Sequence, residues 1–208
     1  MKPLSAKEKS NTHVMSATDV DNAVGVPKRN WYVAVVRRNT EKACREKLEQ
    51  MGCECYVATQ NELRQWKNGQ RKTIERVVIS TIVFIKTTEL QRLQLVKEPF
   101  INRFMTNRLG KVNNFGRHPI ATIPDKEMNT LKFMLYNSEQ PVSFIDSPLK
   151  KGERIRVVRG SLKGLEGNVC ETSDATYVMA DLDILGCAVV RVSIEDIERA
   201  GELNKYEI

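Results

Sequence analysis

The chain has 208 residues, which is enough for one or two domains of ordinary size. Hydrophobic residues make up 41% of it and charged residues 28%, a globular composition that excludes a wholly disordered or fibrous protein. Lys and Arg outnumber Asp and Glu by 33 to 26, and the resulting net charge of +7 favours polyanionic partners such as nucleic acid.

Neither membrane insertion nor secretion is indicated. No apolar run reaches the roughly 20 residues needed to cross a bilayer. Residues 1–29 are polar and lack the apolar core of a secretory signal. The five cysteines are odd in number and irregularly spaced, which is not typical of a disulfide framework. We therefore expect a cytoplasmic protein with reduced thiols and no membrane partner.

Residues suited to catalysis are scarce. Only two histidines occur, and since His13 lies in the polar tail, a catalytic triad or metal site would depend on His118 alone. Cys53 and Cys55 have the wrong spacing for a Cys-x-x-Cys chelate or redox pair. The glycines of 160–167 lack the Lys-Ser/Thr ending of a phosphate-binding loop. The sequence predicts no enzyme, no metal site and no cofactor.

The first part of the chain alternates strands and helices. Residues 31–36 are β-branched and aromatic, as in a buried strand, and 41–51 have the apolar spacing of a helix that Gly52 ends. Asn68-Gly69 is a strong hairpin signal and predicts a basic hairpin within 63–78. The other expected elements are strands at 53–59, 79–86 and 101–106 and helices at 89–96 and from Pro124. This pattern predicts an α+β domain with a mostly antiparallel sheet.

The second part is all-β. Periodicity lapses between 138 and 150, where serines and prolines indicate a linker. Short strands joined by Gly- or Asp-containing turns follow, and they predict a small barrel. The expected organisation is a flexible tail at 1–29, an α+β domain at 30–137, a linker at 138–150 and a barrel at 151–208.

Residues 151–169 carry the most specific motif. The sequence Lys-Gly-Glu-Arg-Ile-Arg-Val-Val-Arg-Gly-Ser-Leu-Lys-Gly-Leu-Glu-Gly-Asn-Val resembles the KOW motif of NusG-type transcription elongation factors. Gly160 and Gly167 stand where a turn needs positive φ or the backbone a close approach. Residues 183–198 resemble the closing strands of the same domain. A KOW motif alone leaves an RNA-binding protein of ribosomal type open as the alternative.

The preceding domain favours NusG. Trp31-Tyr32-Val33, the helix 41–48, Ile82-Val83-Phe84-Ile85 and 120–128 resemble the NusG N-terminal domain in order and spacing. The resemblance implies an N-terminal domain of that type followed by an SH3-like KOW barrel. A specialised paralogue is the nearest likeness, similar to the UpxY-type antiterminators of capsular polysaccharide operons. The chain departs from the family where Ser80-Thr81-Ile82 replaces Pro-Gly-Tyr.

Such a resemblance implies an elongation or antitermination factor that binds the clamp helices of RNA polymerase and suppresses pausing or termination in specific operons. The expected polymerase-binding residues form an apolar depression: Tyr32, Val35, Ile79, Ile82, Phe84 and Phe104. Strand alternation supplies a competing interpretation, in which Tyr32 and Phe84 pack in the core of the domain itself. Ile82 shares a strand face with Phe84, so both follow the same interpretation.

Non-template DNA or nascent RNA is the second implied partner. Arg37, Arg38 and Lys47 occupy positions that contact DNA in specialised paralogues, although alternating charges also make the helix an ordinary salt-bridged surface. In the hairpin an aromatic residue is interleaved with cations, a pattern that suits base stacking and phosphate neutralisation. Alternatively, the hairpin is simply a mobile loop. The hairpin residues are Arg64, Trp66, Lys67, Arg71, Lys72 and Arg76.

The KOW domain is expected to recruit a further protein. In this family it binds ribosomal protein S10 or the termination factor Rho, and in some paralogues it hides its binding surface against the first domain. Leu162, Lys163 and Leu165 lie at a turn and are the expected docking point. Alternatively, either leucine caps the barrel.

Overall fold

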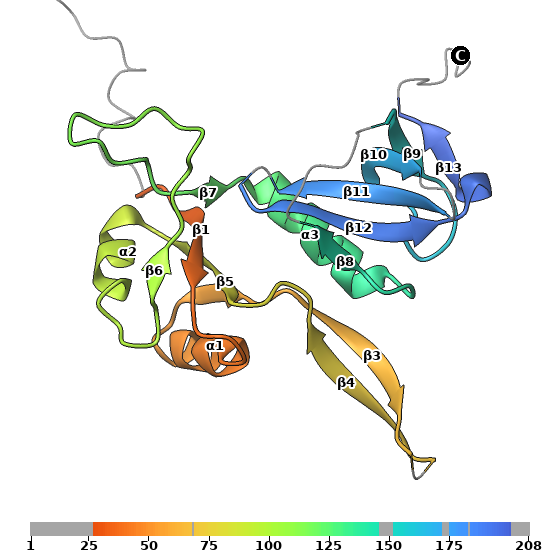
Figure 1. Ribbon diagram of the computed structural model, residues 1–208, viewed down its shortest axis with the longest axis horizontal. Helices are drawn as coiled ribbons and strands as arrows, with labels where there is room; N and C mark the ends of the chain where they lie inside the picture. The colour runs from red at the N-terminus through yellow and green to blue at the C-terminus, as the bar shows by residue number, and fades with distance from the viewer. Residues whose placement is uncertain (1–26, 68, 146–151, 172–174, 183, 201–208) are drawn as a thin grey trace, which may run out of the picture.

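The structure is a computed structural model that describes residues 27–67, 69–145, 152–171, 175–182 and 184–200. Almost all of the predicted tail therefore lies outside the described residues. Two antiparallel sheets lie side by side, with one long helix between them and a hairpin projecting away from the first sheet (Figure 1). No helix in the described part of the chain is long and apolar enough to span a membrane.

The first sheet is built on two central apolar strands. Its strands are β1 (Asn30–Val35), β2 (Glu54–Tyr56), β5 (Ile82–Thr87), β6 (Arg103–Phe104) and β7 (Thr122–Ile123). The order is β2-β5-β1-β6, and β7 also pairs with β1. All pairs are antiparallel, with Val33 opposite Phe84 at the centre. The predicted strand at 101–106 shrinks to β6 because only Arg103 and Phe104 keep ladder register with β1.

Two helices cover one face of this sheet, α1 (Glu41–Gln50) and α2 (Glu89–Leu95). Leu48 of α1 and Leu95 of α2 are buried against the side chains that β1 and β5 direct to this face of the sheet. The apolar spacing of 41–51 predicted this helix, which ends where Gly52 adopts φ of +73°. The Thr88 hydroxyl caps α2 by accepting a hydrogen bond from Gln91 N.

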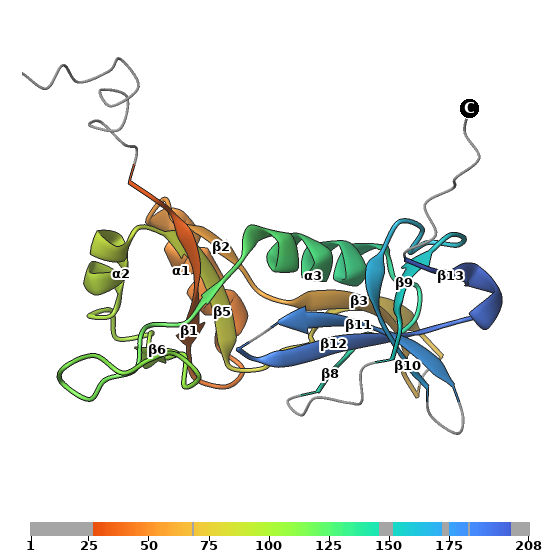
Figure 2. The same cartoon turned by 90° about the horizontal axis from the view of Figure 1, so that it is seen from above.

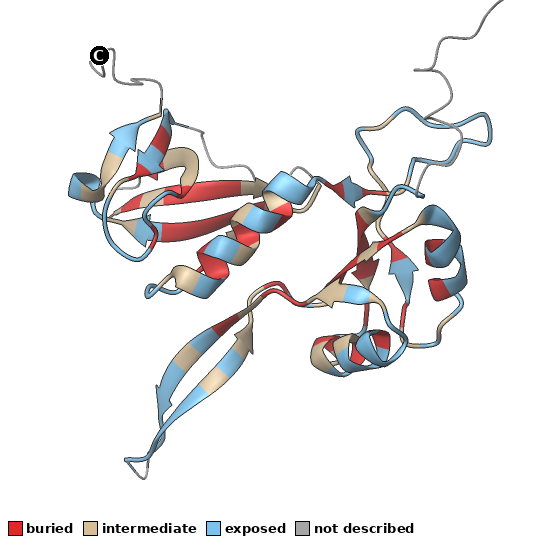
Figure 3. Cartoon of the chain, turned by 180° about the vertical axis from the view of Figure 1, so that it is seen from behind, coloured by how far each residue is buried: buried red, intermediate tan, exposed pale blue. Residues whose placement is uncertain are grey.

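The predicted hairpin is present as β3 (Thr59–Gln65) and β4 (Arg71–Val77), and it forms a two-stranded sheet of its own. Figure 1 shows it extending away from both larger sheets. Its base is fixed by Gln60, whose amide donates to Gln140 O at 2.8 Å and accepts from Val142 N at 2.9 Å. The hairpin is therefore anchored at one end and exposed along its length (Figure 3).

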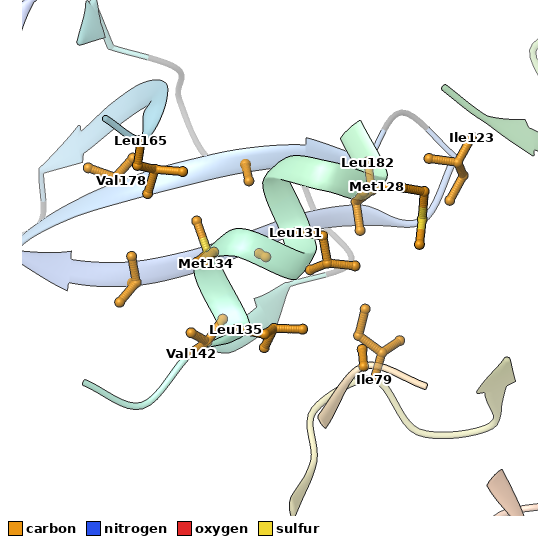
Figure 4. Close-up of a cluster of buried hydrophobic side chains, with 14 of the residues drawn as sticks. Ile79, Ile123, Met128, Leu131, Met134, Leu135, Val142, Leu165, Val178 and Leu182 are labelled. Carbon is orange, nitrogen blue, oxygen red and sulfur yellow. The ribbon is translucent and has the colours of Figure 1, made fainter. Parts of the chain in front are cut away.

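The long helix α3 (Asp125–Asn137) joins the two halves of the molecule. Its start is tied to the first sheet because Trp31 Nε1 and Lys86 Nζ both donate to Asp125 Oδ1, at 2.9 and 2.8 Å. Its buried face packs against the C-terminal sheet and shares one continuous core with both sheets (Figure 4). That face consists of Met128, Leu131, Met134 and Leu135.

The C-terminal sheet contains β8 (Ser143–Ile145), β9 (Arg154–Val157), β10 (Glu166–Glu171), β11 (Thr176–Leu182), β12 (Gly186–Val192) and β13 (Ile197–Arg199), with a short 3-10 helix η1 (Ile194–Asp196) before the last. The order is β13-β9-β10-β11-β12-β8, all antiparallel. Three residues of the predicted linker thus form an edge strand. Gly167 is required by close approach, since a Cβ there would lie 2.3 Å from Met179 O.

Candidate polymerase and nucleic-acid interfaces

The six predicted polymerase-binding residues divide between the two faces of the first sheet. Tyr32 and Phe104 lie under α1 and α2, where their rings meet edge to face with centroids 6.2 Å apart. The guanidinium of Arg92, itself buried, lies 5.4 Å from the Phe104 ring centroid and covers this pair. Both residues are therefore core residues of the α1 and α2 face in this structure.

The other four share the opposite face, which is turned toward α3 and the C-terminal sheet. Phe84 is fully buried at the centre, with its ring centroid 6.3 Å from that of Tyr56. Ile79 and Ile82 are buried, whereas Val35 is half-buried. Ile82 and Phe84 do share a strand face, as alternation predicted.

A cavity of about 540 Å³ lies at the margin of that face. Val35, Ile82 and Met105 line it from the first sheet. Phe144 of β8 and Leu185, in the turn between β11 and β12, line it from the C-terminal half. The apolar face with the predicted polymerase contacts is thus partly covered by the C-terminal half of the same chain.

Two of the three predicted DNA-binding residues near α1 lie beside one hollow in the structure. Arg37 and Arg38 are exposed, and neither forms an ion pair with any described residue. Arg37 and Lys47 line one hollow of about 290 Å³ together with Phe100. The Lys47 ammonium lies 5.3 Å from the centroid of the Phe100 ring. Sequence reasoning did not place Phe100 in this site, because the contact joins segments far apart in the chain.

The remaining cations of α1 follow the salt-bridge interpretation. Lys42 and Arg45 both pair with Glu75 of β4, at 2.9 and 3.3 Å. Thr59 Oγ1 also donates to Glu75. The hydrogen bond from Lys42 is the largest cause that lowers the pKa of Glu75 to about 2, and those from Thr59 and Arg45 add to it. These bonds hold the base of the hairpin against α1.

The far part of the hairpin is rich in positive charge. Residues 63–74 contain four cations and no acidic residue. Arg64 and Lys72 stand directly opposite each other across the strands, and the Arg64 guanidinium is paired with Glu62 of its own strand at 3.3 Å. Alternation places Trp66, 57% exposed, on the face of Arg64, and Arg71 on the other face. Lys67 is exposed at the turn, whose Asn68 lies outside the described residues.

Of the three predicted KOW docking residues, one is exposed to solvent. Lys163 is exposed, whereas Leu162 and Leu165 are buried in the core of the C-terminal sheet. The burial of both leucines agrees with the barrel-capping alternative. Gly160 adopts φ of +75°, so it supplies the positive φ that the motif predicted.

The thiols of Cys44 and Cys55 are not activated as nucleophiles. All five cysteines are free thiols, and burial raises the pKa of Cys44 to about 11 and that of Cys55 to about 12, which keeps both protonated. Across these same residues, no three His, Cys, Asp or Glu side chains gather as a metal site. The surfaces found so far are suited to binding.

Comparison with known proteins decides the family. The sequence model described as "Transcription termination factor nusG" matches residues 29–132, half of the chain. The chain belongs to the NusG family. The structure confirms the predicted fold class, an α+β domain followed by an antiparallel β region. Membership of the family makes the protein a transcription factor that is not an enzyme.

No curated protein matches the chain. Among solved structures, a NusG of Thermotoga maritima described under "Domain interaction in Thermotoga maritima NusG" is 13% identical, with a TM-score of 0.42. The alignment covers 83% of this chain and 98% of that one.

Proposed function

We propose that this NusG-family protein is a specialised antitermination factor, of the kind typified by UpxY, that binds RNA polymerase and suppresses pausing or termination in specific operons such as those for capsular polysaccharide. The observation that carries polymerase binding is the apolar face of Val35, Ile79 and Ile82 beside a cavity of about 540 Å³. Apolar anchors at the edge of a hollow are what a partner helix needs to dock. The clamp helices are the proposed occupant.

Phe144 and Leu185 stand at the entrance to this docking face. Both are only half-buried, so the C-terminal half covers the face without filling the cavity. A partner helix that docks against Ile79 and Ile82 has to displace them. We infer that movement of the C-terminal half accompanies polymerase binding, and that the covered arrangement lowers the affinity of the free protein.

Non-template DNA is the proposed second ligand of the first domain. Arg37 and Arg38 are exposed and carry no ion pair among the described residues. A guanidinium has the planar fork that binds phosphate or guanine edges. In the hairpin, Arg71 and Lys72 would contact phosphate while Trp66 stacks on an unpaired base.

The C-terminal half is proposed to recruit a further protein, ribosomal protein S10 or Rho, through the exposed side of its sheet around Lys163. The alternative function, an RNA-binding KOW protein of ribosomal type, gains no support because the family match lies in the first domain.

The double variant Arg37→Ala with Arg38→Ala is expected to weaken protection of the non-template strand, and its free energy of unfolding should stay within about 1 kcal/mol of the parent.

Transcription by the cognate polymerase tests the proposal, on a template that carries a strong pause, a terminator and the native leader. Read-through is expected to rise when the protein is added. Leu185→Ser should bind polymerase more tightly because it opens the docking face, whereas Ile82→Asp should abolish binding. Ile194→Ser is the matched control, since Ile194 is exposed and lies away from the cavity. No read-through on any template, with native folding of all variants, would reject the function.

A further inference from the structure

Residues 107–119, here called the 107–119 loop, form a second basic surface that the functions above do not use. The loop leaves the first sheet through the bridge between Thr106 and Ile120. Between Glu98 and Asp125 the chain has four cations, Arg103 and three in the loop, and no acidic residue. The three are Arg108, Lys111 and Arg117, and all are exposed.

The loop has a defined internal structure. Asn107 N donates to Pro119 O at 2.8 Å, and Asn113 N donates to Arg117 O at 2.9 Å. The Asn113 side chain then accepts from Phe115 N at 3.0 Å and from Arg117 N at 2.9 Å. Phe115 and Arg117 are thus presented on a hydrogen-bonded turn, which lowers the entropy lost on binding.

Large apolar side chains project from the loop. Leu109 is 92% exposed and Phe115 is 86% exposed, which makes the loop one of the exposed regions seen in Figure 3. Neither belongs to a core cluster of the described residues. An aromatic ring exposed among cations suits base stacking with neighbouring phosphate contacts.

The loop cations also lack partners. Within the described ranges, Arg108, Lys111 and Arg117 form no ion pair, whereas Lys42 and Arg45 of α1 are paired with Glu75. Three unpaired positive charges in the same loop as one exposed ring make a surface that is complementary to a polyanion with exposed planar bases. A duplex hides its base faces, so the fitting ligand is single-stranded nucleic acid.

We propose that the 107–119 loop is a binding site for single-stranded RNA. The choice of RNA over DNA rests on the proposed function: the hairpin of β3 and β4, assigned to non-template DNA, lies at the opposite end of the first sheet from this loop (Figures 1 and 2). A strand held at the hairpin leaves the loop free for a second strand. The other unpaired strand in a transcription complex is the nascent RNA.

Fluorescence anisotropy of a labelled 12-nucleotide oligouridylate with the full chain tests the site without polymerase, so its result is independent of the proposed function. Phe115→Ala is expected to weaken binding about tenfold, while Phe115→Trp retains it because the ring is kept. Arg108→Gln with Arg117→Gln should lower the slope of log affinity against log salt by about 1.4, at about 0.7 for each phosphate contact. Tyr136→Ala removes an equally exposed aromatic of α3 and should change neither.

Three results would overturn the proposal. The first is oligouridylate binding that Phe115→Ala leaves unchanged. The second is loop-dependent binding of oligothymidylate without binding of oligouridylate, which would assign the loop to DNA. The third is a loss of polymerase affinity in Phe115→Ala with RNA binding intact, which would make the loop a protein contact. Because Phe115 is 86% exposed, the melting temperatures of all variants should match that of the parent.

Discussion

Thr81 occupies a strained backbone position that a single substitution can relieve. Its φ is +65°, in the left-handed region that a β-branched residue disfavours. Two hydrogen bonds hold it there: Thr81 N donates to Glu41 Oε1 at 2.7 Å, and Thr81 O accepts from Val36 N at 2.9 Å. Glu41 is buried at the start of α1. The backbone is thus fixed from both sides, and Thr81→Gly is expected to stabilise the protein.

The magnitude follows from two opposing free energies. A left-handed conformation costs an L-residue about 1–2 kcal/mol, and glycine avoids that cost. Glycine loses about 0.5–1 kcal/mol more backbone entropy on folding. The net gain is about 0.5–1 kcal/mol, which in a chain of this length raises the melting temperature by about 2 °C. Both hydrogen bonds use backbone atoms of residue 81 and persist.

Thermal and urea denaturation of three variants measure this gain. Thr81→Ala keeps a Cβ and should gain little. Asn39→Gly is the matched control, because Asn39 has a similar φ of +63° but asparagine tolerates it. A Thr81→Gly variant that melts below the parent, or that gains no more than Asn39→Gly, would refute the strained conformation of Thr81.

Three further changes have defined outcomes. Phe84→Ala should lower the free energy of unfolding by about 3–5 kcal/mol in urea denaturation, because the ring is fully buried. If the variant kept native stability and lost only polymerase binding, Phe84 would instead be an exposed anchor. Glu75 has a pKa lowered from 4.5 to about 2, so its stabilisation is present above about pH 4.5 and lost as pH falls toward 2. Glu75→Gln should therefore flatten the stability profile between pH 5 and 2 measured by urea midpoints. Gln60→Leu leaves the buried N–H of Val142 without its acceptor and should cost about 1–3 kcal/mol in urea denaturation, whereas Gln65→Leu on the exposed part of the same strand should cost little.

Local patterns in the sequence identified the elements of the first domain well. Helix spacing located α1, and Asn68-Gly69 located the hairpin, because both signals act within a few residues. Thr81 shows how a departure from a family pattern can be interpreted: it stands where the family has glycine and keeps positive φ. The strand predicted at 79–86 accordingly begins only at Ile82, after that turn.

Assignments that depend on tertiary contact were beyond sequence reasoning. Alternation groups Ile82 with Phe84, but it does not say which layer covers their face. Glu75 pairs with α1, and Lys47 lies over the Phe100 ring. Both contacts join residues about 30 to 50 positions apart, so no pattern within a few residues of sequence predicts them. The 107–119 loop was overlooked because it has no periodicity, although its run of cations without an acidic residue is visible in the sequence.

Helix α3 accounts for the coupling between the two halves. A helix that served only the first sheet would bury its apolar face there, yet Met128 and Leu131 pack in a core that also contains Val178 and Leu182 of β11 (Figure 4). Its first residue, Asp125, is bonded to β1 and β5. Removing the C-terminal half would therefore expose the apolar face of α3 as well as Val35 and Ile82. An opening that uncovers the docking face for polymerase can happen in two ways. Either α3 and the C-terminal sheet move away from the first sheet as one unit, or the C-terminal sheet moves alone and leaves the apolar face of α3 exposed to solvent.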